Sequence, residues 1–203
     1  MPKRNERSQK RRSKPSFVTI CYLYGVQTQA FGMNSLPRFK LRRWQRGDEE
    51  SLVRYADNYQ IWRNVRDSFP HPYTWQHAQD WITFCQSEKT PSVFAIEING
   101  EAVGSVGIIP QKDIYCKNAE IGYWLAEPFW GRGIMSEALK EMCGYVFQTF
   151  TIRQIYACVF EYNVASLRVL EKAGFERVSI QKKWLFKEGK FWDNHLFVRV
   201  CNE

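Results

Sequence analysis

The sequence predicts a domain of the α/β class, in the broad α+β sense, with a mixed sheet and helices packed on its faces. Three observations lead to this class. After a first strand and two helices, strand-like and helix-like segments follow the order ββαβαββ. The pair Asn99-Gly100 separates two strand-like runs, and this pair is preferred in hairpin turns that need positive φ at both residues. Finally, 203 residues with 44% hydrophobic content suit one globular domain.

Hydrophobic periodicity in the first half predicts a strand at 38–44, helices at 48–65 and 75–86, and a hairpin at 92–109. Asp48 and Thr74 stand immediately before the two helical runs, where their side chains can cap the first backbone N–H groups. The segment "SFPHPY" lies between these helices. We expect it to separate them, because proline cannot continue a helix and restricts the residue before it.

The second half predicts strands at 119–125 and 152–160, helices at 134–147 and 163–173, and a final hairpin at 179–200. In the first of these helices, Met135, Leu139 and Met142 fall on one face, which indicates an apolar side turned to the core. Gly174 follows the second helix at the position where glycine commonly ends a helix.

The positive charge of the chain is concentrated at its N-terminus. The whole sequence carries a net charge of +8, but the first 14 residues hold seven Lys or Arg and one acid. A terminal block of like charge is usually a solvated arm. We interpret residues 1–36 as an extension that is disordered or a non-native start, with Met33 as an alternative first residue, and 37–203 as the domain. A targeting segment remains open.

The cysteines argue for a reducing compartment. The six cysteines show no Cys-x-x-Cys pair and no Cys/His spacing typical of zinc sites. We therefore expect reduced thiols, a cytoplasmic location and no metal. No run approaches the roughly 18 apolar residues of a membrane span, so no membrane association is expected. Nucleic-acid binding is not expected from the domain, since the basic tail alone would suggest it.

The stretch "EIGYWLAEPFWGRGIMSEAL" carries the main functional signal. Gly131 and Gly133 stand between a strand and a helix, where unpaired N–H groups and the helix dipole favour an anion such as phosphate. Arg132 adds a cation and Ser136 a hydroxyl at the same helix end. The pattern lacks the third glycine of a dinucleotide-binding loop and the Lys-Ser/Thr ending of a Walker loop.

This stretch, followed by "NVASLRVLEKAGF", resembles the acetyl-CoA-binding core of the GNAT N-acetyltransferase superfamily. The branch typified by ribosomal-protein alanine acetyltransferases is the closest. The resemblance covers Arg38 to Val200. It implies a mostly antiparallel sheet with a central, splayed parallel strand pair and helices on both faces. The family's pyrophosphate loop falls on 130–135, where Trp130 replaces the usual Gln or Arg and Met135 the usual small residue.

The resemblance also implies acetyl-CoA as the acetyl donor, direct transfer in a ternary complex and no metal. The pantetheine arm would lie between the strands that contain Trp124 and Cys158, and the pyrophosphate would lie at the glycine loop. The residues assigned to cofactor binding in this way are Trp124, Leu125, Gly131, Arg132, Gly133, Ile134, Met135, Ser136, Asn163 and Arg168.

Acetyl transfer needs a base for the amine and an acid for the departing thiolate. By the resemblance, Glu120 is the candidate base, acting directly or through water, and Ser166 the candidate acid. Each has a plainer interpretation: Glu120 as a solvated edge carboxylate, and Ser166 as a first-turn residue behind an Asn163 cap. Tyr123 falls on the opposite face of the strand from Glu120 and is expected in the core.

The acceptor wall of similar proteins corresponds to Phe69, Tyr73 and Trp184, with Pro70 and Phe186 beside them. These segments show no dominant acidic cluster, which favours a protein or peptide α-amine as the acceptor. Two alternatives stay open: a small-molecule amine such as a polyamine or antibiotic, and a non-catalytic acyl-CoA sensor. The protein is expected to be a monomer or homodimer.

Overall fold

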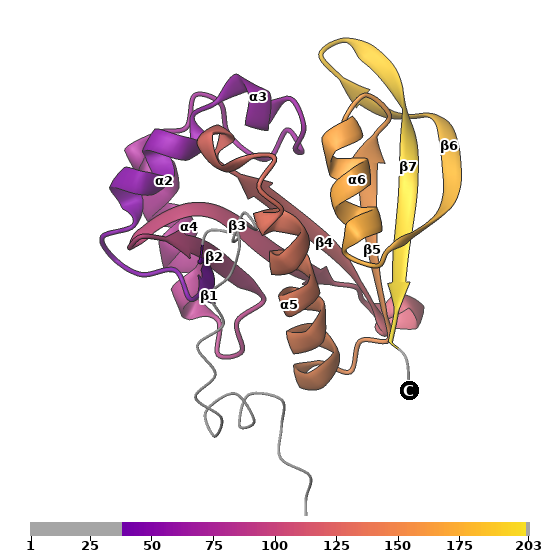
Figure 1. Cartoon of the computed structure of the whole chain (residues 1–203), viewed down its shortest axis with the longest axis horizontal. Coiled ribbons are helices and arrows are strands. Elements are labelled where there is room, and N and C mark those ends of the chain that lie inside the picture. The colour runs from indigo at the N-terminus through magenta and orange to yellow at the C-terminus, as the bar shows by residue number, and fades with distance from the viewer. Residues whose placement is uncertain (1–37, 202–203) are drawn as a thin grey trace, which may run out of the picture. The chain divides into compact units, whose positions relative to one another are not determined.

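The computed structural model describes residues 38–201, so the expectations for residues 1–36 lie outside it. Within these residues the chain forms seven strands, five α-helices and two 3-10 helices (Figure 1). Their bounds, in chain order, are β1 Lys40–Arg42, α2 Glu49–Ala56, α3 Tyr59–Trp62, α4 Trp75–Ser87, β2 Val93–Ile98, β3 Glu101–Pro110, η1 Asp113–Tyr115, β4 Asn118–Leu125, η2 Glu127–Phe129, α5 Ile134–Thr149, β5 Gln154–Phe160, α6 Val164–Lys172, β6 Glu176–Lys187 and β7 Lys190–Val200.

The strands form one sheet in the order β1-β2-β3-β4-β5-β7-β6. All neighbouring strands are antiparallel except β4 and β5, which are parallel. This confirms the predicted mixed, mostly antiparallel sheet. The parallel pair follows from the connection, since α5 carries the chain from the end of β4 back to the start of β5.

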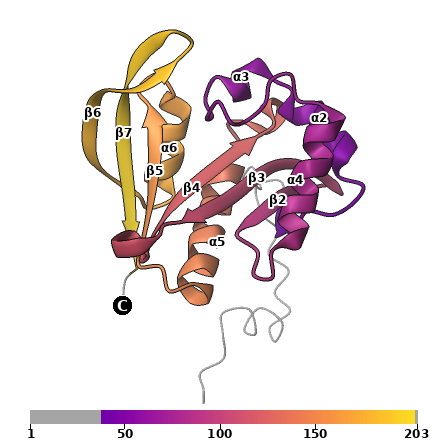
Figure 2. The same ribbon diagram turned by 180° about the vertical axis from the view of Figure 1, so that it is seen from behind.

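Helices cover both faces of the sheet, as expected. Helices α5 and α6 lie on the face turned toward the viewer in Figure 1, and α4 lies on the face seen from behind in Figure 2. Two apolar cores result. The larger core joins α5 to the sheet through buried residues such as Leu139 and Met142. The smaller core lies under α2 and α4 and includes Trp44, Ile82 and Trp124.

Most of the local predictions are confirmed. Thr74 caps α4, because its hydroxyl accepts a hydrogen bond from the His77 N–H at 3.3 Å. Asn99 and Gly100 both have positive φ, at 52° and 89°, in the turn between β2 and β3. Gly174 follows α6 with φ 81°.

The single helix predicted over 48–65 is wrong: the structure has two short helices there, α2 and α3. Asn58 interrupts the helix with an extended backbone, and its side chain accepts a hydrogen bond from the Gln60 N–H at 2.7 Å. This side chain offers the backbone a local alternative to continuing the helix. The capping role of Asp48 is also wrong, because its carboxylate binds the Arg42 guanidinium at 2.6 and 2.7 Å.

Candidate active site

The central feature of the sheet is the separation of β4 from β5. These strands pair only at their first residues, from Asn118 opposite Gln154 to Glu120 opposite Tyr156. Beyond this point β4 stays paired with β3 up to Leu125, while β5 stays paired with β7. Figures 1 and 2 both show the two strands diverging toward the start of α6. The facing strand edges therefore have backbone groups that do not pair with each other and can bind a ligand.

The glycine loop stands at the end of β4 and leads into α5. Gly131 and Gly133 both take left-handed backbone angles, with φ of 72° and 77°, and Gly133 is the N-cap residue of the helix. The indole Nε1 of Trp130 donates to the carbonyl of Leu125 at 2.6 Å and so ties the loop to the strand. The first N–H groups of this 16-residue helix therefore lie beside the glycine loop, at the kind of helix start that can bind an anion.

The first three residues of α5 are buried. Ile134, Met135 and Ser136 are 1%, 7% and 4% exposed. Ser136, whose hydroxyl is expected beside an anion at this helix end, is thus a buried residue, and its contact with a ligand stays a prediction. The exposed Arg132 is the mobile cation of the loop, with its guanidinium 5.6 Å from the centre of the Phe129 ring.

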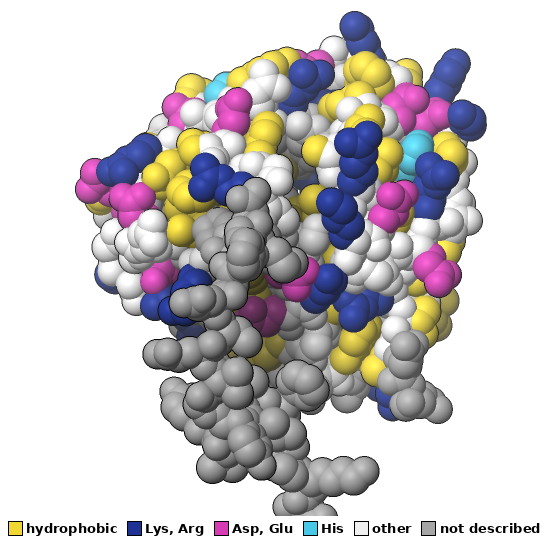
Figure 3. Space-filling view, in the orientation of Figure 1, with side chains coloured by type: hydrophobic (Ala, Val, Ile, Leu, Met, Phe, Trp, Pro, Cys, Tyr) yellow, Lys and Arg dark blue, Asp and Glu magenta, His cyan; other side chains and the backbone are white. Residues whose placement is uncertain are grey.

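The outer surface of α6 continues this positive region. Arg168 and Lys172 are exposed on the helix, and Figure 3 shows Lys and Arg side chains gathered over this part of the face. Asn163 stands at the start of α6, where its side chain accepts a hydrogen bond from the Ser166 N–H at 3.1 Å. The capping role given to Asn163 is thus confirmed.

A polar hollow of about 300 Å³ lies between α3 and the start of α6, at the wide end of the strand opening. Gln60, Arg63 and Asn64 line one side, and Asn163 lies on the other. The Nε of Arg63 and the Oδ1 of Asn64 are buried and have no hydrogen-bond partner within the described residues. Buried polar atoms are rarely left in this state, so an enclosed water molecule is expected beside them.

Ser166 forms a pair that the sequence did not predict. Its hydroxyl lies 2.7 Å from the hydroxyl of Tyr123, and either can be the donor. Burial raises the pKa of Tyr123, so its phenol stays protonated at neutral pH. Strand alternation correctly placed Tyr123 opposite Glu120, but it could not show that α6 brings Ser166 onto that face.

Glu120 lies at the point where β4 and β5 begin to separate. Its side chain is 15% exposed, and both carboxylate oxygens accept hydrogen bonds from Arg66 at 2.5 Å. The hydroxyl of Tyr156 lies 3.5 Å from the same carboxylate. Burial, with the charge of Glu120 as the second cause, raises the pKa of Tyr156. Arg66 was missed in the sequence because it lies in a loop outside any motif.

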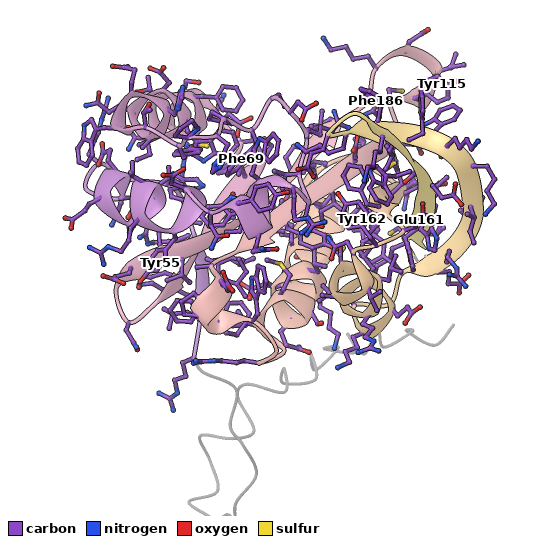
Figure 4. All side chains as sticks on the ribbon, turned by 90° about the horizontal axis from the view of Figure 1, so that it is seen from above. Tyr55, Phe69, Tyr115, Glu161, Tyr162 and Phe186 are labelled. Atoms are coloured by element: carbon purple, nitrogen blue, oxygen red, sulfur yellow. The ribbon has the colours of Figure 1, made fainter. Side chains whose placement is uncertain are left out.

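The proposed acceptor wall divides into buried and exposed members. Phe69 packs edge-on against Trp124, with ring centres 6.2 Å apart, and lies 5.2 Å from the Tyr73 ring. Tyr73 is only 6% exposed, so it supports Phe69 from behind. Trp184, on β6, is 66% exposed. Figure 4 labels Phe69 on the N-terminal side and Phe186 on the β6–β7 hairpin.

Lys187 links the hairpin to the loop that carries Arg66. Its ammonium is buried, donates to Asp67 at 2.6 Å and to the Val65 carbonyl at 3.2 Å, and lies 3.8 Å from the centre of the Trp62 ring. An ion pair of this kind fixes two segments that are more than 100 residues apart in the chain. The two walls beside Glu120 are therefore held together by a direct contact.

Within residues 38–201 the structure shows no group of three metal-binding side chains, and no helix there is long and apolar enough to cross a membrane. The opening between β4 and β5 has the glycine loop at its wide end. It is flanked by Glu120 on one face of β4 and by the Tyr123–Ser166 pair on the other.

Comparisons with known proteins agree with this architecture. Residues 38–176 match the family model described as an acetyltransferase (GNAT) domain. The chain is 37% identical over 86 residues to a probable N-acetyltransferase, YjcK, of Bacillus subtilis, and this alignment spans 42% of the chain and 47% of that relative. It is 26% identical to the ribosomal protein uS5-alanine N-acetyltransferase of Escherichia coli over 153 residues, 72% of the chain and 78% of the relative.

Among solved structures, the spermidine N-acetyltransferase of Vibrio cholerae in complex with CoA and spermine superposes with a TM-score of 0.67 at 20% identity. The superposition covers 80% of this chain and 95% of that one. At this identity the likeness shows the fold alone. The match of the family model to most of the described domain, together with the splayed strand pair and the glycine loop, shows that the chain belongs to the GNAT acetyltransferase family.

Proposed function

We propose that the protein is an acetyl-CoA-dependent N-acetyltransferase that acts on a primary amine, and that this amine is the α-amine of a protein or peptide. The opening between β4 and β5 carries this proposal. It provides a backbone edge for an elongated ligand and an anion-binding helix end at one extremity. Titratable side chains flank it on both faces.

The residues around the opening fit coenzyme A. Backbone N–H groups from Gly131 to Ser136 would hold the pyrophosphate, and Arg132 and Arg168 would contribute positive charge. The pantetheine amides would meet the strand edge at Trp124 and Leu125 and the hollow beside Asn163. The polar residues that line this hollow, Gln60, Arg63, Asn64 and Asn163, support this assignment, since their amide and guanidinium groups are suitable hydrogen-bond partners for the amides of pantetheine.

The chain's own side chains then have separate tasks. The acetyl thioester supplies the acyl group when bound. Glu120 would accept a proton from the incoming ammonium, directly or through a water molecule, so that the amine becomes nucleophilic. On the other face, the Ser166 hydroxyl would donate a proton to the departing thiolate. Tyr123 would orient that hydroxyl and replenish its proton, because its raised pKa keeps it protonated.

The choice of a peptide amine rests on two supports. The E. coli relative is named for the α-amine of a ribosomal protein alanine. In addition, the acceptor walls offer exposed aromatic surface, with Trp184 and Phe186 at 66% and 59% exposure, which suits an extended peptide. A small-molecule amine is the second candidate, since the Vibrio cholerae structure is named for spermidine.

A thiol-release assay tests the function. The purified protein is given acetyl-CoA and a panel of peptides, polyamines and aminoglycosides, and the Glu120→Gln and Ser166→Ala variants are run beside it. We expect turnover on peptides, with kcat lowered about 10²- to 10⁴-fold in Glu120→Gln while CoA affinity is retained. CoA binding without turnover on any amine would contradict the enzyme and favour an acyl-CoA sensor.

A further inference from the structure

Arg66 occupies the position on Glu120 that an amine substrate needs. Its guanidinium donates to both carboxylate oxygens at 2.5 Å. The Arg66 side chain is 65% exposed and comes from the loop after α3, whereas the Glu120 side chain is 15% exposed and fixed in β4. The mobile partner of this pair is therefore the arginine, and an incoming ammonium must exchange with it before the amine can lose a proton to Glu120.

The remaining carboxylates of the acceptor walls, residues 57–73 and 184–191, are already engaged. Asp67 pairs with Lys187 at 2.6 Å. Glu188 accepts from the Tyr59 hydroxyl at 2.5 Å. Asp57 accepts from the Tyr73 N–H at 2.9 Å and lies 3.3 Å from His71. A second ammonium on the acceptor would thus meet partnered carboxylates and the positive charge of the displaced arginine.

We propose that Arg66 is a specificity-determining residue that selects acceptors with one ammonium group and a carboxylate on the next residue. The acceptor class is then a peptide with an acidic residue directly after its N-terminal residue, in preference to a polyamine. The ammonium takes the place of Arg66 on Glu120, and the released guanidinium binds the neighbouring carboxylate. Arginine suits this role because its planar fork binds carboxylates through two parallel hydrogen bonds. This inference rests on the proposed function for the meaning of the acceptor site.

The test compares peptides that differ only at the second residue, Ala-Asp, Ala-Asn and Ala-Lys, with spermidine as a fourth ligand. Their dissociation constants are measured by calorimetry on the full chain saturated with CoA, which permits binding without reaction, and kcat/KM is measured separately with acetyl-CoA. The variants are Arg66→Ala, Arg66→Lys and, as the matched control, Arg54→Ala. Arg54 is also an exposed arginine paired with carboxylates, Glu50 and Glu101, but it lies on α2.

We expect the unmodified protein to bind the Ala-Asp peptide about tenfold more tightly than Ala-Asn, and Ala-Asn more tightly than Ala-Lys or spermidine. That ratio corresponds to one charge-assisted contact. In Arg66→Ala the affinities for the Ala-Asp and Ala-Asn peptides should differ by less than about twofold. The Ala-Lys peptide should bind more tightly than it binds the unmodified protein, because the Arg66 guanidinium no longer competes for Glu120. Arg66→Lys should retain part of the preference, and Arg54→Ala all of it.

Two results separate this inference from the proposed function. Equal affinities for the Asp and Asn peptides, or an unchanged ratio in Arg66→Ala, would overturn the role of Arg66 even if the protein turns over peptides. An Arg66-dependent preference without any turnover would support the role of Arg66 and contradict the acetyltransferase activity. Thermal unfolding of each variant verifies that it is folded, and a preference that weakens in high salt supports the charge-based mechanism.

Discussion

Two glycines in the same region should respond to alanine in opposite directions. Gly131 has φ 72°, and a Cβ built on it meets no atom within 4 Å, so the cost of an alanine there is backbone strain alone. For an L-residue this left-handed conformation costs roughly 1–2 kcal/mol. Gly144 lies inside α5 with ordinary helical angles and equally free space. Alanine there should stabilise the helix by about 0.5–1 kcal/mol.

For a domain of this size, 1 kcal/mol shifts the melting temperature by about 2–4 °C. We therefore expect Gly131→Ala to melt about 2–8 °C lower and Gly144→Ala about 1–4 °C higher than the parent, by circular dichroism. Gly131→Ala should also affect ligand binding. If the loop relaxes in the free variant and must return to the left-handed angle on binding, the same 1–2 kcal/mol lowers the affinity for CoA about 5- to 30-fold, as measured by calorimetry. Gly144→Ala should leave CoA affinity unchanged.

A Gly131→Ala variant that matches the parent in both melting temperature and CoA affinity would refute this role of Gly131, because the left-handed angle would then be unnecessary. A Gly144→Ala variant that lowers CoA affinity to the same degree would refute it as well. The second result would mean that any change in α5 disturbs the site, and that the loop geometry is not the cause.

Three further predictions concern the walls, acid stability and the N-terminal residues. Lys187→Met should lower the free energy of unfolding by about 2 kcal/mol and raise KM for the acceptor, because a charged hydrogen bond and a cation–π contact are lost. The control Lys140→Met breaks an exposed pair with Glu137 and should change the free energy of unfolding by less than about 0.5 kcal/mol. Equal melting temperatures for the two variants would refute the stabilising contact between Lys187 and the loop. Hydrogen bonds from Lys40, and to a smaller extent from Arg42, lower the pKa of Glu97 in the folded protein. The contribution of Glu97 to stability is therefore present above pH 4.5 and is lost as the pH falls through its pKa in the folded state. The difference in melting temperature between the parent and Glu97→Gln should shrink from pH 7 to pH 3, and a constant difference would contradict this. Removal of residues 1–36 should leave kcat/KM within about twofold, and loss of activity would refute a domain at 37–203.

The sheet and most helix bounds could be predicted because local signals agree with the fold. The Asn99-Gly100 turn, the Thr74 cap and the glycine after α6 are short-range features, and each forms as its chemistry requires. The break at Asn58 was missed because an apolar stripe continues through it. A side chain that binds its own backbone two residues on leaves the hydrophobic pattern unchanged.

The candidate site was predictable only where it follows a motif. The glycine loop, Glu120 and Ser166 lie in segments that resemble the family. Arg66 and Tyr123 form hydrogen bonds with partners 54 and 43 residues away, respectively, and no local pattern encodes such pairs. The burial of Ser136 was also beyond the sequence, since the exposure of a first-turn residue depends on how α5 packs against the sheet.

The short pairing between β4 and β5 lets a small local change alter the width of the opening. The two strands are joined by three residue pairs, and β4 then runs five residues farther, about 17 Å at the usual rise of a strand. A tilt of β4 by a few degrees at the paired residues moves the far end of the strand by about an ångström over that length. The paired residues include Ala119 and Ile155, both fully buried. Volume changes at these two positions should therefore adjust the width of the opening from a distance, without altering any residue that a ligand touches.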